Sequence, residues 1–166
     1  MRITRAAAAI ALALALLPAA TPRAAQLGLA TSTGTLARLI IESRDQIDRG
    51  EAEAAYAALA AQLGLYAGDP EFDYLLGIAA LDTGRAGEAL LALERVLLVQ
   101  PDHLQARAEL GRAYLATGEY ENARAAFRDG AARDIPPEAR RLVGRYLDEI
   151  ARLEARQRIA ITGLIG

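Results

Sequence analysis

Two ten-residue stretches of this chain are nearly the same and lie 34 residues apart. LLGIAALDTG begins at Leu75, and ELGRAYLATG begins at Glu109. Aligning residues 70–103 with 104–137 gives eight identities in 34 positions without a gap, and aligning 36–69 with 70–103 gives seven. A fixed period of this length over three copies is typical of a solenoid, in which stacked copies of one unit bury a shared core.

Each copy has the apolar spacing of two helices. The predicted helices are 71–82 and 86–99 in one copy, and 104–116 and 120–133 in the next. Gly84 and Gly118 follow the first helix of each pair, where glycine can adopt the left-handed conformation that ends a helix. Gly77 and Gly111 lie inside the first helices, where glycine costs about 1 kcal/mol relative to alanine. We expect close contact between the two helices to offset that cost.

The residues at fixed places in each copy resemble the tetratricopeptide repeat. The copy from Leu104 carries Leu110, Gly111, Tyr114, Gly118, Ala123 and Phe127, and departs from the pattern at Gly130 and Ile135. The copy from Pro70 carries Leu76, Gly77, Gly84, Ala89 and Pro101, with Ala80 in place of the aromatic residue. The copy from Leu36 keeps only Gly50, Ala55 and Leu59, and Ser43 replaces its first glycine.

The fold class that follows is all-α: a tetratricopeptide-type α-solenoid of about three helix-turn-helix repeats and a C-terminal capping helix. The repeats cover 36–136, as 36–69, 70–103 and 104–136, and the capping helix covers 137–158. The capping helix has an apolar stripe of Leu142, Tyr146, Ile150 and Leu153 and an otherwise charged surface. A terminal element of this kind closes the open end of a stack.

The first residues have the layout of a secretory signal peptide. Arg2 and Arg5 precede an apolar run from Ala6 to Leu17, which is too short to cross a bilayer as a helix. We therefore expect residues 1–25 to be a signal peptide and 26–35 a linker, and we expect the protein to be exported to the periplasm. An uncleaved N-terminal anchor is the alternative.

The last residues, 159–166, carry no charge, and Ile159, Ile161 and Ile165 alternate as in a strand. A disordered end, or one that folds back on the capping helix, is the simpler interpretation. An exported repeat region followed by a "PPE" helix and a glycine-containing strand also resembles the N-terminal region of the surface lipoprotein assembly modifier family. That resemblance implies a periplasmic repeat domain ahead of an outer-membrane β-barrel, with 159–166 as a truncated first strand.

The composition excludes several kinds of site. With no cysteine there is neither a disulfide nor a thiolate zinc site, and we expect no metal, no cofactor and no catalytic residues. His103 is the one histidine, and in the turn QPDH we expect it to be exposed. A net charge of −2 argues against nucleic acid as a partner. Contact with a membrane is expected only through the signal peptide or a missing C-terminal barrel.

The tetratricopeptide resemblance implies that the first helix of each repeat lines a concave groove that binds a protein or peptide. The candidate partner-binding residues are Glu71, Tyr74, Ile78, Asp82, Gln105 and Arg112, and Arg44 and Asp48 fall on the same face in the weak copy. Tyr74 and Arg112 are the principal candidates, because tyrosine and arginine dominate interface energetics. The alternative is that Tyr74 only packs and Arg112 is only solvated.

The function expected from the sequence is an exported scaffold without catalysis, which mediates protein–protein contact through its groove. The alternative is the periplasmic part of an outer-membrane export or assembly protein truncated before its barrel.

Overall fold

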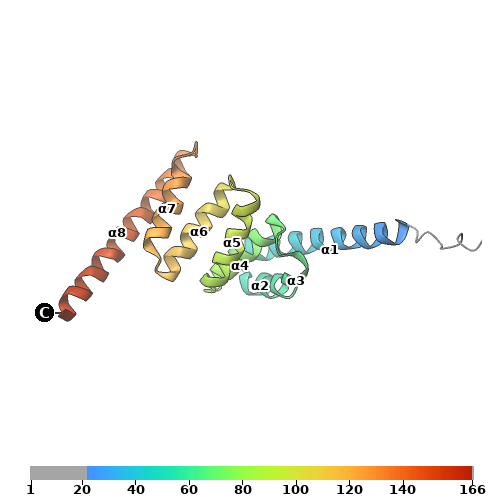
Figure 1. Ribbon diagram of the computed structural model, residues 1–166, viewed down its shortest axis with the longest axis horizontal. Coiled ribbons are helices and arrows are strands. Elements are labelled where there is room, and N and C mark those ends of the chain that lie inside the picture. Colours follow the sequence, from blue (N-terminus) through green and yellow to red (C-terminus); the bar gives the residue numbers. More distant parts are fainter. Residues whose placement is uncertain (1–21, 166) are drawn as a thin grey trace, which may run out of the picture. The chain divides into compact units, whose positions relative to one another are not determined.

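The computed structural model describes the backbone of residues 22–165 and the side chains of residues 34–159. Every element assigned in that range is helical, which confirms the all-α fold class. The helices are α1 (Pro22–Asp48), α2 (Ala52–Ala60), α3 (Leu63–Tyr66), α4 (Pro70–Asp82), α5 (Ala86–Val99), α6 (Leu104–Thr117), α7 (Tyr120–Ala131) and α8 (Pro137–Ile165). Residues 35–166 form one compact unit that contains the repeats. Figure 1 shows α4 to α8 following one another through this unit.

The two strong repeats have the predicted helices, as α4 with α5 and α6 with α7. The weak repeat differs, because its second helix is divided into α2 and the single turn α3, with a break at Ala61–Gln62. Gly64 and Gly68 lie in this part of the chain, and glycine lowers helix stability. Tyr66 of α3 then lies against Phe72, with ring centroids 5.8 Å apart.

The turn between the two helices of a repeat is the same in all three copies. Gly50, Gly84 and Gly118 have φ values of 77°, 78° and 80°, in the left-handed region that glycine adopts without strain. In each copy the amide of the next residue donates back to a carbonyl five residues earlier, as in the bond from Glu119 N to Tyr114 O at 2.8 Å. This Schellman-type end satisfies carbonyls that the helix would leave unpaired.

Glycine inside the first helix of a repeat receives a bulky side chain from the second helix. A Cβ atom placed on Gly77 would lie 2.6 Å from Leu93 Cγ, and one placed on Gly111 would lie 2.9 Å from Phe127 Cε1. Both distances are well inside the normal 3.5–4.0 Å contact of carbon atoms. Ser43 holds the same position in the weak repeat and is fully buried. The expected close contact between the two helices is present in both strong repeats.

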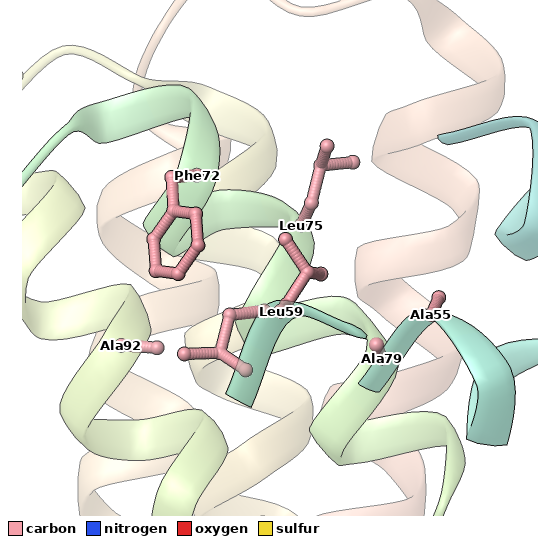
Figure 2. Packing of buried hydrophobic residues seen from close by; sticks show 7 residues of the cluster. Ala55, Leu59, Phe72, Leu75, Ala79 and Ala92 are labelled. Carbon is pink, nitrogen blue, oxygen red and sulfur yellow. The ribbon is translucent and has the colours of Figure 1, made fainter. Parts of the chain in front are cut away.

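The core consists of three clusters, each shared between neighbouring helices. The first cluster contains Ala55, Leu59, Phe72, Leu75, Leu76, Ala79 and Ala92. Figure 2 shows Leu59 and Phe72 gathered beside Ala92, so that α2, α4 and α5 meet there. The next cluster lies between α4, α5 and α6, and the last joins α7 to α8 through Phe127 and Ile150. Each repeat therefore completes the core of its neighbour, as the solenoid architecture requires.

Helix α8 packs on α7 as expected of the capping helix. Ile150 is fully buried, and the rings of Phe127 and Tyr146 stack with centroids 4.7 Å apart. Arg141, Arg145 and Arg152 lie on the exposed side of α8. Within residues 22–165, none of the helices combines the length and apolar character that crossing a bilayer requires.

Two expectations about the ends differ from the structure. The interpretation of 159–166 as a strand is wrong for its described part, because α8 continues to Ile165. A strand needs a partner to pair with, whereas a helix extends by its own hydrogen bonds. Residues 26–35, expected to be a linker, are part of α1. The predicted signal peptide lies outside the described residues except for 22–25, which begin α1.

Substituting Gly77 by alanine tests the close contact between α4 and α5. Gly77→Ala should lower the free energy of unfolding by up to about 2 kcal/mol, because overpacking costs about 1–3 kcal/mol and the gain in helix propensity recovers about 1 kcal/mol. Urea unfolding followed by circular dichroism measures the change.

Gly144→Ala is the matched control, since Gly144 also lies inside a helix but has no neighbouring atom within 4 Å of the place that a Cβ would take. It should raise stability by up to about 1 kcal/mol. Equal effects of the two substitutions would contradict the contact.

Candidate functional site

A cleft of about 500 Å³ lies between α1, α4 and the start of α6. Its lining comes from α1 (Arg44, Ile47, Asp48), from α4 (Pro70, Glu71, Tyr74, Leu75, Ile78) and from the α5–α6 turn and α6 (Gln100, His103, Gln105). Three successive first helices thus contribute to one surface. Aliphatic and aromatic side chains of α4 line it together with charged and amide side chains.

Four of the six predicted partner-binding residues meet in this cleft. Glu71, Tyr74 and Ile78 come from consecutive turns of α4, and Gln105 faces them from α6. Arg44 and Asp48, which the repeat pattern placed on the same face, line the cleft from α1. The repeat spacing therefore brings these side chains together, and their role in binding stays a prediction.

Asp82 and Arg112 lie outside the cleft lining and contact each other. Arg112 Nη2 is 3.3 Å from Asp82 Oδ1, and Arg112 also pairs with Glu109 one turn earlier on α6. Burial raises the pKa of the Glu109 carboxyl, and the neighbouring Arg112 guanidinium offsets part of this rise. Arg112 thus lies between a carboxylate of α4 and a carboxylate of its own helix α6, rather than being free in solvent.

His103 has a structural role that the sequence did not predict. It is partly buried, and its Nδ1 accepts a hydrogen bond from the Ala106 amide at 3.1 Å, which caps α6. The expectation of a fully exposed side chain is wrong because the ring also lies on Tyr74, with centroids 4.8 Å apart. Burial raises the pKa of the Tyr74 hydroxyl, and the charge of Glu109 adds to this effect while Arg44 opposes it. The position of His103 directly before a helix was the available signal for a cap.

A buried ion pair fixes the helix that forms the centre of the cleft. Asp73 is fully buried, and its carboxylate accepts from Arg95 Nη2 at 2.6 Å and Nε at 3.0 Å. The Gly68 amide donates to the same carboxylate at 2.8 Å. Asp69 caps α4 by accepting from the amides of Glu71 and Phe72. The start of α4, which carries Glu71 and Tyr74, is therefore tied to both α5 and the preceding loop.

Comparison with protein families matches a range that covers most of the two strong repeats. Residues 74–140 match a family model described as tetratricopeptide repeat. The matched residues, 67 of the 166 in the chain, are similar to tetratricopeptide repeats. The matched range begins inside α4 and extends into α8, so it includes the α5, α6 and α7 helices whose glycine contacts are described above.

Three known proteins show the similarity in sequence or structure. A surface lipoprotein assembly modifier of Moraxella catarrhalis is 34% identical over 73 residues, which are 44% of this chain and only 14% of that protein. The type III secretion translocator chaperone SycD of Yersinia enterocolitica has a TM-score of 0.65 and 19% identity, over 74% of this chain and 88% of that one. SycD is also known in complex with a peptide of the translocator YopD, with a TM-score of 0.61, 20% identity and coverage of 73% and 95%.

The third is the tetratricopeptide domain of Sgt2 from Aspergillus fumigatus. Its TM-score is 0.58 at 22% identity, over 73% of this chain and 80% of that domain. At such low identities the structural similarities establish the helical-repeat fold. The relative found by sequence is much longer than this chain, which spans about a seventh of its length.

Asp73→Asn tests whether the buried ion pair holds α4. The substitution leaves Arg95 without its carboxylate, and we expect a loss of roughly 2–4 kcal/mol in the free energy of unfolding, since Arg95 is still partly exposed. Glu53→Gln, which breaks the exposed pair of Glu53 with Arg85, is the matched control and should change stability little. Thermal unfolding of both variants measures the difference, and equal midpoints would contradict the role given to Asp73.

Proposed function

We propose that the protein binds an extended segment of another protein in the cleft between α1, α4 and α6, and that it acts as a scaffold without carrying out a reaction. The observation that carries this proposal is the cleft itself, whose 500 Å³ falls within the range of about 300–1,000 Å³ typical of ligand sites. In this proposal Glu71, Tyr74, Ile78 and Gln105 contact the segment directly.

The chemistry of the cleft supports a peptide as the occupant. Tyr74 and Ile78 are both half-buried and offer apolar surface to the cleft. The exposed amide side chains of Gln100 and Gln105 also line it and can donate to and accept from a peptide backbone. Protein interfaces commonly combine apolar and polar side chains of this kind.

The comparisons support the same class of partner. SycD, which shares the helical-repeat fold, is described in complex with a peptide of its translocator. In this proposal Asp82 and Arg112 extend the binding surface beyond the cleft, along the face shared by α4 and α6.

The second candidate is a role in the periplasm as part of an outer-membrane assembly protein. The similarity to a surface lipoprotein assembly modifier favours this candidate. The basic and apolar pattern of the first 25 residues, which is that of a signal peptide, supports export. Both candidates use the same cleft and differ in where the protein works.

Ile78→Ser tests the cleft as the peptide site. Peptides selected on the full chain from a random phage-displayed library should lose affinity by about tenfold, because burial of an aliphatic side chain contributes about 1.5–3 kcal/mol and serine replaces only part of its contact. Fluorescence anisotropy with labelled peptides measures Kd.

Leu98→Ser is the matched control, since Leu98 is an exposed leucine of α5, 82% accessible, that does not line the cleft. It should leave the affinity unchanged. If both substitutions weaken binding equally, or neither does, the site lies elsewhere.

Export is tested by expression of the full chain in a Gram-negative host, fractionation and N-terminal sequencing. The protein should be recovered from the periplasmic fraction with its N-terminus near residue 26. Recovery from the cytoplasm with Met1 or Arg2 first would contradict export. An intact N-terminus in the inner-membrane fraction would favour the uncleaved anchor instead.

A further inference from the structure

The charges along the face that carries the cleft do not balance. From α1 to α6 this face carries the arginines Arg44 and Arg112 and the acids Asp48, Glu71, Asp82 and Glu109. Arg44 pairs with Glu71, and Arg112 lies between the other two acids of α4 and α6. The surplus on this face is two negative charges.

Of the four acids named on this face, Asp48 is the one without an ion pair among the described residues. It is exposed at the end of α1, and it lines two adjoining hollows. One is the cleft, and the other is a smaller hollow of about 230 Å³ that includes Ile40 and Ile41. Ile41 is 68% exposed, which leaves a large apolar side chain open to solvent beside the carboxylate.

The two hollows place apolar surface beside one carboxylate. Ile40 and Ile41 line the smaller hollow, Ile47 and Ile78 line the cleft, and Asp48 lines both. A ligand that satisfies all of these groups combines a positive charge with aliphatic side chains. A negatively charged segment would meet the surplus of acids, and like charges brought together at an interface cost binding energy.

We propose that the segment bound in this cleft is a basic and aliphatic peptide, with a lysine or arginine side chain against Asp48 and aliphatic side chains against the isoleucines that line the cleft and the smaller hollow. This inference rests on the proposed function and adds the chemical class of the partner. Asp48 supplies the selectivity between charges, and the apolar surfaces supply affinity that is independent of charge.

The test uses three labelled peptides that differ only in charge: GSILKGKLIGS, and the same sequence with both lysines replaced by glutamine or by glutamate. Fluorescence anisotropy with the full chain at about 50 mM NaCl measures Kd for each. The lysine peptide should bind about tenfold more tightly than the glutamate peptide, with the glutamine peptide between them. At about 500 mM NaCl the difference should shrink, because salt screens exposed charges.

Asp48→Asn should bring the affinities of the lysine and glutamine peptides together while leaving that of the glutamine peptide unchanged. Asp148→Asn, which removes an exposed carboxylate from α8, is the matched control and should leave the preference for lysine as it is. A preference that survives Asp48→Asn, or that Asp148→Asn reduces equally, would overturn the role of Asp48.

Failure of this inference can be told apart from failure of the proposed function. If all three peptides bind equally, and Ile78→Ser weakens all three, the cleft binds peptides and the preference for basic partners is wrong. If the glutamate peptide binds most tightly, the inference is wrong in sign. If none of the three binds and library selection on the same chain yields no cleft-dependent peptide, the proposed function is contradicted as well.

Discussion

The structure depends on a close approach between the two helices of each repeat. At Gly77 and Gly111 the first helix has no side chain, and Leu93 or Phe127 of the second helix occupies the space where a Cβ would be. This contact fixes how far apart the helices of a pair lie and where along each helix they meet. A chain rich in alanine and poor in large side chains has little other apolar surface with which to set that geometry.

The same contact determines which side chains are available for binding. Because the second helices cover one side of α4 and α6, the opposite side of these first helices is left for Tyr74, Ile78 and Gln105. The buried pair of Asp73 with Arg95 then ties the start of α4 to α5. The cleft is thus formed by side chains on packed helices rather than on long loops, which favours a preorganised site.

The repeat period made much of this predictable. Equivalent positions 34 residues apart occupy equivalent places, so the left-handed glycines followed from alignment of the chain with itself, and the helix bounds of the strong repeats followed from their apolar spacing. The shared face of Glu71, Tyr74 and Ile78 followed from the resemblance to the tetratricopeptide repeat. Features that occur only once were not predictable in this way. Asp73 has no acidic counterpart at Arg107, and its partner lies 22 residues away, so nothing in the sequence joined it to Arg95.

The ends of the chain were harder to predict for a related physical reason. Alternating isoleucines in 159–166 indicated a strand, but the period of a short apolar run does not decide between strand and helix. In the structure, helix α8 extends through these residues to Ile165. In the weak repeat, the period predicted one second helix, and the structure divides it at Ala61–Gln62 into α2 and α3.

The most direct test of the central contact is the proton NMR spectrum of Gly111. Because Phe127 Cε1 and Cζ lie 2.9 Å from the position a Cβ would occupy, one Gly111 Hα should be shifted strongly by the ring current and should give nuclear Overhauser effects to the Phe127 ring protons. Gly144 Hα, which has no such neighbour, is the internal reference. A Gly111 Hα at the same ordinary shift as that of Gly144, without contacts to the ring, would contradict the packing from which the rest of the structure follows.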